Sequence, residues 1–88
     1  MGSAGIIPRV YTLPDCPKCD ELKEWLQGER VEFDVQSFDT DTQLKFIMKN
    51  MFGNPPILEL GDEAYFSEVL FPKEVLDVEK VKEVLDSA

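Results

Sequence analysis

Residues 10–26, with the sequence VYTLPDCPKCDELKEWL, carry the strongest structural signal in the chain. A β-branched and aromatic run opens this stretch, and apolar residues with the spacing of one helix face continue it as far as Leu26. Gly28 stands where the carboxyl end of a helix would be capped. The pattern therefore predicts a strand, a turn, and then a helix that starts near Cys16 and ends near Gln27.

Cys16 and Cys19 are predicted to lie on the same face of the first turn of this helix. A helix N-terminus carries partial positive charge and unpaired N–H groups, so we expect the pKa of Cys16 to lie below the usual thiol value of about 8.5. The thiolate is the form that attacks disulfides, and a second sulfur one turn away resolves the mixed disulfide. We therefore predict a redox-active Cys16–Cys19 disulfide, with Cys16 as the nucleophile and Cys19 as the resolving cysteine.

The two residues between the cysteines are candidates for contact with a target. Pro17 is tolerated at the first helical position, because its missing N–H would be unpaired there anyway. Lys18 places a positive charge beside the pair, which Asp15 and Asp20 oppose. Lys18 either tunes the dithiol or is simply a solvated side chain, and the second interpretation is the plainer one.

Length and charge predict one small globular domain over residues 6–88, preceded by a flexible lead-in at residues 1–5. The net charge of −9, from 18 acidic and 9 basic side chains, argues against partners such as nucleic acids or anionic membranes. It suits neutral or basic protein partners, although solubility explains it equally well. No segment has the length of a membrane helix or the pattern of a signal peptide, so we expect a cytoplasmic monomer.

The chain has two cysteines and no histidine, and both cysteines belong to the C-x-x-C motif. A secreted disulfide scaffold spreads more cysteines along its sequence, and a structural zinc site needs four ligands, mostly Cys and His. We therefore expect no metal site. The redox interpretation is favoured over a metal-binding or purely structural role, mainly because a strand precedes the motif and a helix follows it.

The rest of the chain completes the order β-α-β-α-β-β-α. The first strand, at residues 6–12, is apolar on both sides and should be central. A strand at residues 31–38 alternates apolar and polar residues, so it should be half-buried and parallel to the first. The last strands, at 57–60 and 64–71, should form an antiparallel pair. Asp77 can cap a final helix whose buried face is formed by Val78, Val81, Val84 and Leu85.

The second helix is expected between Asp39 and Gly53, with its N-cap among residues 39–42. An apolar stripe recurs along it with helical spacing, which predicts a face buried in the core more readily than a binding surface. Phe46 lies off this stripe and is predicted to be exposed. The residues of the stripe are Leu44, Ile47, Met48 and Met51.

Pro55 and Pro56 lead directly into the apolar strand at residues 57–60. X-Pro bonds have a reduced preference for trans, and a cis bond in a folded protein is usually a placed feature. A trans Pro-Pro turn that delimits the strand is an equally good interpretation of these residues alone.

The element order, the Cys-Pro-x-Cys motif after the first strand and the proline before the third resemble the glutaredoxin branch of the thioredoxin fold. The segment VYTLPDCPKC is also similar to the small glutaredoxin-like electron donors of ribonucleotide reductase. The resemblance implies an α/β fold with a four-stranded mixed sheet and helices on both faces. It also implies that Pro56 is cis, stands beside the dithiol, shapes a groove for the target backbone and keeps Cys16 from holding a metal.

Three positions depart from the glutathione site of that family. Leu13 stands where glutaredoxins carry a basic residue, and Pro55 has no N–H to offer the ligand. The Gly-Gly and Ser/Thr-Asp segment after the fourth strand is replaced by residues 70–74, LFPKE. We therefore expect weak glutathione binding and an apolar rim for protein targets, formed by Leu13, Pro14, Pro55 and Phe71.

These features predict a thiol–disulfide oxidoreductase that uses a dithiol to reduce protein or small-molecule disulfides. Such an enzyme requires no dissociable cofactor. We expect a protein reductase, flavoprotein or ferredoxin-linked, to reduce it in preference to glutathione. One alternative is a module that binds an iron–sulfur cluster between two protomers, since soft thiolates suit such clusters. Another is a non-catalytic interaction module on the same fold.

Overall fold

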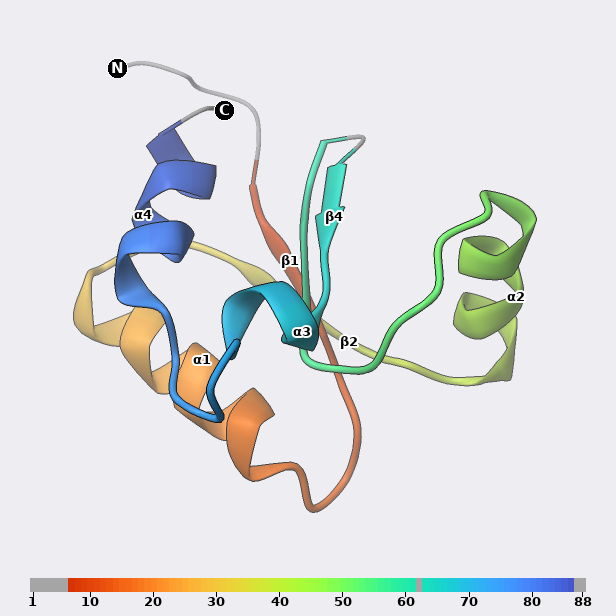
Figure 1. Ribbon diagram of the computed structural model, residues 1–88, viewed down its shortest axis with the longest axis horizontal. Helices are drawn as coiled ribbons and strands as arrows, with labels where there is room; N and C mark the ends of the chain where they lie inside the picture. Colours follow the sequence, from red (N-terminus) through yellow and green to blue (C-terminus); the bar gives the residue numbers. More distant parts are fainter. Residues whose placement is uncertain (1–6, 62, 87–88) are drawn as a thin grey trace.

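The computed structural model describes residues 7–61 and 63–86, so the predicted lead-in at residues 1–5 lies outside the described part. Four strands form one mixed sheet in the order β2-β1-β3-β4 (Figure 1). β1 pairs in parallel with β2 and antiparallel with β3, and β3 pairs antiparallel with β4. The strands are β1 (Arg9–Thr12), β2 (Asp34–Ser37), β3 (Ile57–Leu60) and β4 (Glu63–Tyr65). The helices are α1 (Pro17–Gly28), α2 (Thr40–Met48), α3 (Ser67–Leu70) and α4 (Val78–Asp86).

The predicted element order is confirmed, with the addition of α3. The predicted strand at residues 64–71 is wrong beyond Tyr65, because the chain turns into α3 there. The pairing register between β3 and β4 explains why β4 ends at Tyr65. Tyr65 pairs with Leu58, so continued pairing would place Ser67 opposite Pro56, which has no N–H for the ladder. The backbone N–H of Ser67 donates to the carbonyl of Asn54 instead, at 3.2 Å.

The first two strands are shorter than predicted. β1 is central, as expected, but it begins at Arg9, with Ile7 exposed before it and Ile6 outside the described residues. β2 is not half-buried: all four of its residues are exposed, and Val35 is 52% accessible. This strand lies at the sheet edge, and the apolar residues that pack on the core, Val31 and Phe33, come before it.

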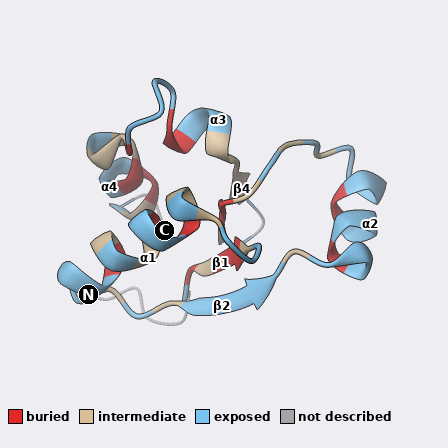
Figure 2. Ribbon diagram, turned by 90° about the horizontal axis from the view of Figure 1, so that it is seen from below, coloured by how far each residue is buried: buried red, intermediate tan, exposed pale blue. Residues whose placement is uncertain are grey.

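One face of the sheet carries the main core, between β1, β3 and the helices α1, α3 and α4 (Figures 1 and 2). Alternate residues of a strand point to opposite faces, so Val10 and its partner Leu58 point into this core. The predicted face of α4 is confirmed, with Val81 and Val84 almost fully buried. The core residues of this face are Val10, Leu22, Leu26, Leu58, Leu60, Leu70, Phe71, Leu76, Val81 and Val84.

The other face is covered by α2 through a small aromatic cluster. The ring of Phe46 lies 5.2 Å from that of Tyr11 and 5.7 Å from that of Phe66, in edge-to-face geometry. Phe46 is 5% exposed, so its predicted exposure is wrong. Thr42, one turn earlier on the same side of α2, is the other buried residue of the helix, and its hydroxyl donates to the carbonyl of Ser37.

The predicted buried stripe of the second helix is also wrong. Leu44, Ile47 and Met48 are 52%, 48% and 83% exposed, and only Met51 is half-buried. The helix ends at Met48, well before Gly53, so Met51 is not part of it. A helix of nine residues that packs through one large ring presents the opposite side of its surface to water.

Both capping predictions hold. The carboxylate of Asp39 accepts from the N–H of Thr42 at 2.9 Å, and that of Asp77 accepts from the N–H of Lys80 at 3.1 Å. In the described part of the chain, no helix is both long and apolar enough to cross a membrane.

Candidate dithiol site

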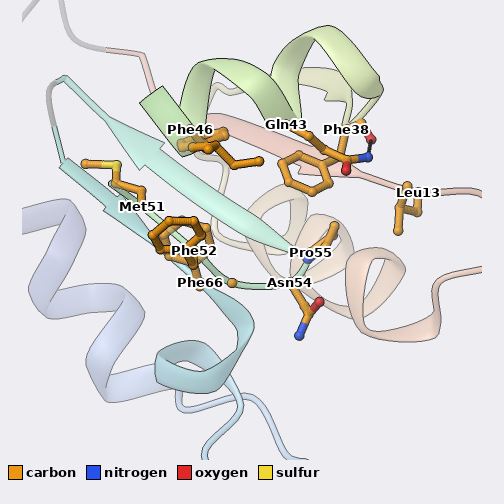
Figure 3. Close-up of a pocket in the computed structure, with 11 residues that line it drawn as sticks. Leu13, Phe38, Gln43, Phe46, Met51, Phe52, Asn54, Pro55 and Phe66 are labelled. Carbon is orange, nitrogen blue, oxygen red and sulfur yellow. Dashed lines mark hydrogen bonds between the residues drawn. The ribbon is translucent and has the colours of Figure 1, made fainter. Parts of the chain in front are cut away.

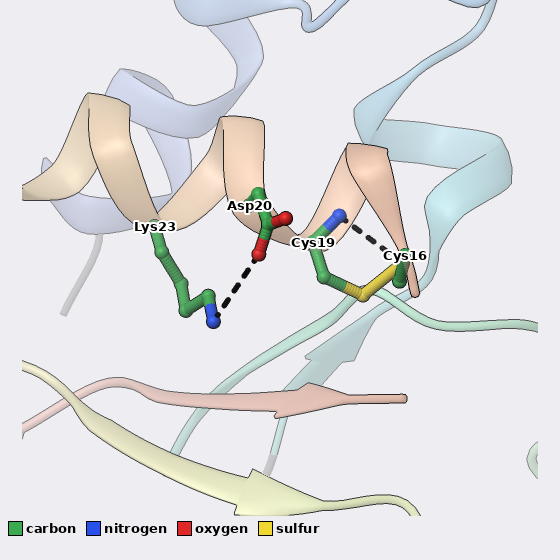
Figure 4. The surroundings of a disulfide bond; sticks show 4 residues. All are labelled: Cys16, Cys19, Asp20 and Lys23. Carbon is green, nitrogen blue, oxygen red and sulfur yellow. Dashed lines mark hydrogen bonds and ion pairs between the residues drawn. A yellow bond between two sulfur atoms is a disulfide. The ribbon is translucent and has the colours of Figure 1, made fainter. Parts of the chain in front are cut away.

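The two cysteines form a disulfide at the start of α1 (Figure 4). Cys16 is the N-cap residue, with extended backbone, and Pro17 is the first residue of the helix, as predicted. The Cα atoms of Cys16 and Cys19 are 5.2 Å apart, within the range that a disulfide spans. The sequence therefore places both sulfur atoms at one helix end.

The backbone of the first helical turn points its donors at Cys16. The N–H of Cys19 donates to Cys16 Sγ at 3.2 Å, and the N–H of Asp20 donates to the carbonyl of Cys16 at 3.1 Å. Cys16 is half-buried, whereas Cys19 is 1% exposed. A reagent from solvent therefore meets the sulfur of Cys16 first, and that sulfur already has a helix-end N–H beside it.

Lys18 is not simply solvated. Its Nζ lies 2.7 Å from a carboxylate oxygen of Glu74 and 5.7 Å from the centre of the Phe71 ring. It therefore joins the start of α1 to the segment between α3 and α4. Phe71 is 3% exposed and belongs to the main core, so the structure does not place it in the apolar rim. Asp20, on the same turn of α1, is paired with Lys23 at 3.5 Å.

The bond between Pro55 and Pro56 is cis, as the family resemblance implied. Pro56 is buried, and Pro55 is half-buried. The segment that enters β3 passes beside the start of α1 in Figures 1 and 4. The chain thus brings the cis-proline and the dithiol to the same end of the sheet.

A groove with a volume of about 400 Å³ lies between α2 and the segment that leads to the cis bond (Figure 3). Leu13 and Pro55 line this α2 groove, which places two of the predicted rim residues together. Pro14 and Pro17 are exposed and are not among its lining residues. The other side of the groove, where α2 contributes Ile47, was not predicted from the sequence. The helical spacing of Ile47 favours a buried position, whereas the structure exposes this residue.

Four of the eleven residues that line the groove are phenylalanines. Figure 3 shows Phe38 and Phe46 on one side, Phe52 and Phe66 on the other, and Leu13 at one end. The rings of Phe38 and Phe46 are 6.0 Å apart. The lining of the groove is therefore partly aromatic.

The acidic side chains of the described residues do not gather into a metal site. In the described ranges, 7–61 and 63–86, there is no group of three or more Cys, His, Asp or Glu residues arranged to hold a metal ion.

Comparisons with known proteins identify the fold. Neither a protein-family model nor a curated protein sequence matches this chain. The crystal structure of the thioredoxin-like protein BC3987 matches with a TM-score of 0.66 and 22% identity, over 88% of this chain and 97% of that chain. A point mutant of the same protein matches with a TM-score of 0.67 and 21% identity, over 89% and 97% of the two chains. This chain therefore has a thioredoxin-like fold, with a close cysteine pair that fits a C-x-x-C motif and is capable of redox chemistry.

Proposed function

We propose that the protein is a small dithiol thiol–disulfide oxidoreductase, in which Cys16 attacks the target and Cys19 resolves the intermediate. The observation that carries the proposal is the N-cap position of Cys16, whose Sγ accepts the N–H of Cys19 at 3.2 Å. Thioredoxin-like neighbours and the disulfide between the two cysteines support it.

Reduction of a target proceeds in two exchanges. The Cys16 thiolate attacks one sulfur of the target disulfide, so that a Cys16–target disulfide forms, and the other target sulfur leaves as a thiolate that takes a proton from water. Cys19 then loses its proton to water, and its sulfur attacks Cys16 Sγ. The Cys16–Cys19 disulfide forms, and the second target sulfur leaves. Two electrons pass from the dithiol to the target, and a reductase returns them.

The helix end explains why the roles fall to these two residues. The backbone donor at Cys16 Sγ and the partial positive charge of the α1 N-terminus both stabilise a thiolate more than a thiol. Cys19 is 1% exposed, so it meets a target only after that target is bonded to Cys16. Cys16 is therefore the attacking sulfur.

We further propose that the electrons come from a protein reductase, flavoprotein or ferredoxin-linked, rather than from glutathione. The side chain of Leu13 offers no charge to glutathione, and Pro55 offers it no backbone N–H. Where glutaredoxins hold the γ-glutamyl end, residues 71–74 carry Glu74, which is already paired with Lys18 at 2.7 Å. Because this carboxylate already has Lys18 as its partner, it is not free to bind the ammonium group of the γ-glutamyl end.

Reduction of insulin disulfides by dithiothreitol tests the redox function. We expect wild type to accelerate the reaction and Cys16→Ser to leave it at the uncatalysed rate. Cys19→Ser is the matched control, since it also removes the internal disulfide but keeps the nucleophile. It should accumulate a mixed disulfide with the target, visible by mass spectrometry. Equal activity of wild type and Cys16→Ser would reject the proposal.

A second assay ranks the electron donors. Oxidised protein is mixed either with reduced glutathione or with a flavoprotein disulfide reductase and its nicotinamide cofactor. We expect the flavoprotein to reduce the Cys16–Cys19 disulfide faster. The opposite ranking would reject the preference for a protein reductase but leave the dithiol chemistry intact.

A further inference from the structure

A small polar cavity lies between α2 and the sheet, with a volume of about 90 Å³. Phe46 is the one residue that it shares with the α2 groove. We propose that this polar cavity binds an inorganic phosphate ion or the phosphate group of a small ester. The binding is independent of the dithiol chemistry, because Arg9, which lines the cavity, begins β1, whereas Cys16 follows the other end of that strand.

The floor of the polar cavity is the face of the sheet that α2 covers. Arg9 and Tyr11 of β1 point to this face, because alternate residues of a strand share one side. Arg9 pairs with Glu59 of β3, and Tyr11 pairs with Gln36 of β2. Cross-strand partners point to the same face, and all four of these residues line the cavity. Three strands therefore contribute polar side chains to one place.

One side of α2 and its C-cap covers this floor. Thr42, Lys45, Phe46 and Lys49 line the cavity, and they are spaced as residues of one helix face. Thr42 and Phe46 are the buried residues of α2, so this face is the one turned toward the sheet. The opposite side of the helix carries exposed apolar residues. The two lysines therefore stand on the side where a helix ordinarily places apolar residues.

Positive charge is in excess around the polar cavity. Its lining includes Arg9, Lys45 and Lys49 but one carboxylate, Glu59. The chain has 9 basic side chains and a net charge of −9, so three cations beside one cavity are unusual for it. The Glu59 carboxylate accepts from the hydroxyl of Tyr11 at 3.0 Å and lies 3.8 Å from Nη1 of Arg9. Arg9 thus balances Glu59, and the charges of the two lysines remain.

Two further carboxylates lie near these cations without lining the cavity. Asp34 is the partner of Arg9 in the pairing of β1 with β2, and Asp39 attracts Lys45. The Asp39 carboxylate already accepts the N–H of Thr42 as the N-cap of α2. Within the described ranges, neither lysine of the cavity forms an ion pair. Both ammonium groups are therefore available to a ligand.

The donors and the size of the polar cavity fit a small oxyanion. A volume of about 90 Å³ corresponds to roughly three water molecules at about 30 Å³ each, which excludes a large ligand. Arginine and lysine side chains donate and do not accept, and their hydrogen bonds to phosphate oxygens are charge-assisted. Gln36 adds an amide donor. Glu59 is the one anionic group of the lining, so a cation is the poorer ligand.

A bound anion would connect α2 to the sheet. Its contacts would come from Arg9 and Gln36 on the strands and from Lys45 and Lys49 on the helix segment. The buried contact of α2 with the sheet is otherwise formed mainly by Phe46. A ligand that binds the folded state alone stabilises it by mass action, so phosphate should raise the unfolding temperature.

Titration of the disulfide form with sodium phosphate at neutral pH tests the site, with ionic strength held constant by sodium chloride. Amide NMR spectra should show saturable shifts at Gln36, Thr42 and Lys49, with a dissociation constant of about 1–10 mM. At about 50 mM phosphate, the unfolding midpoint should lie about 5 °C above that in chloride. Absence of saturable shifts at these residues would overturn the proposal.

Variants separate binding from the general stabilising effect of phosphate, which is excluded from protein surfaces. Lys45→Gln and Lys49→Gln change exposed side chains, so the fold should survive. We expect each to weaken phosphate binding about fivefold through the loss of one charge-assisted contact. Lys82→Gln is the matched control, because Lys82 is an exposed lysine on α4 that does not line the cavity. It should bind phosphate as wild type does.

Glycerol 3-phosphate distinguishes the two sources of the phosphate group. Similar affinity for this ester and for inorganic phosphate would place an ester phosphate in the polar cavity. Binding of inorganic phosphate alone would identify the ligand as the free ion. If phosphate affects wild type, Lys49→Gln and Lys82→Gln equally, the cavity is not a binding site. None of these results alters the insulin assay of the dithiol, so the redox function is tested separately.

Discussion

On one face of the sheet, α1, α3 and α4 bury a large and mainly aliphatic cluster, whereas on the other face α2 contributes one buried ring, Phe46. The neighbours Val10 and Tyr11 of β1 point into these two environments. The dithiol lies on α1, which belongs to the densely packed face. The α2 groove lies on the sparsely packed face.

The two faces therefore differ in how firmly packing holds their helices. A nucleophile must keep its geometry, and a helix held by a large core provides that. The α2 face instead leaves apolar side chains exposed.

Truncation of a core leucine should separate the two faces most clearly. Leu22 is fully buried on α1, so Leu22→Ala should lower the free energy of unfolding by about 2–5 kcal/mol. Leu44 is 52% exposed on α2, and Leu44→Ala should change it by less than about 0.5 kcal/mol. Urea denaturation measures both. A cost well above this for Leu44→Ala would mean that α2 packs through the stripe that its sequence predicts.

A pair of glycines tests how closely the chain approaches itself near the groove. A Cβ at Gly53 would collide with the ring of Phe66, so Gly53→Ala should cost about 1–3 kcal/mol of stability. Gly28, the last residue of α1, has open space around it, and Gly28→Ala should stabilise by about 0.5–1 kcal/mol. Opposite shifts of the urea midpoint are expected. A neutral Gly53→Ala would show that Phe66 moves away easily.

The ion pair between Lys18 and Glu74 should contribute little to stability, because Glu74 is 82% exposed. A double-mutant cycle with Lys18→Gln and Glu74→Gln should give a coupling free energy of about 0.2–1 kcal/mol, which falls with added salt. A coupling that persists at high salt would contradict an exposed pair and would make the segment between α3 and α4 a firmer part of the site.

The N-cap of α2 should give the smallest effect, and it should depend on pH. The N–H of Thr42 donates to the Asp39 carboxylate and lowers its pKa below the usual value. The stabilisation is therefore present at pH above the unfolded-state pKa and is lost as pH falls through the lower folded-state pKa. Wild type should be more stable than Asp39→Asn at neutral pH, with the difference shrinking toward pH 2. A difference independent of pH would exclude the carboxylate as its source.

The sequence predicted the dithiol end of the molecule well, because local rules govern it. A proline at the first helical position, a strand before it and an apolar helix face after it are enough to place Cys16 and Cys19. The cis bond at Pro56 did not follow from local rules, since two prolines allow either isomer. The family resemblance selected the isomer that the structure shows.

The sparsely packed face was not predictable in the same way. Helical periodicity counts apolar residues on each side of a helix, and it ranked the side of Leu44, Ile47 and Met48 first. The position of α2 depends instead on one aromatic contact between Phe46 and Tyr11, residues far apart in sequence. The groove depends on the same long-range contact, so its lining from α2 was missed.

The ends of the strands were mispredicted for a related reason. The alternation at residues 31–38 indicates a strand but does not reveal that no helix covers it. The apolar residues after Tyr65 fit a strand or a helix equally well. The chain leaves the sheet there because continued pairing would place Ser67 opposite Pro56, which has no N–H to donate. The first outcome depends on how the helices cover the sheet and the second on a pairing partner, and local pattern contains neither.

The proposed redox function depends most directly on Cys16 being the reactive sulfur. Reduced protein treated at neutral pH with less than one equivalent of iodoacetamide, then digested and analysed by mass spectrometry, measures this. We expect the label on Cys16 and an unmodified Cys19, because Cys16 has the helix-end donor and Cys19 is 1% exposed. Equal labelling of the two cysteines, or preferential labelling of Cys19, would contradict it.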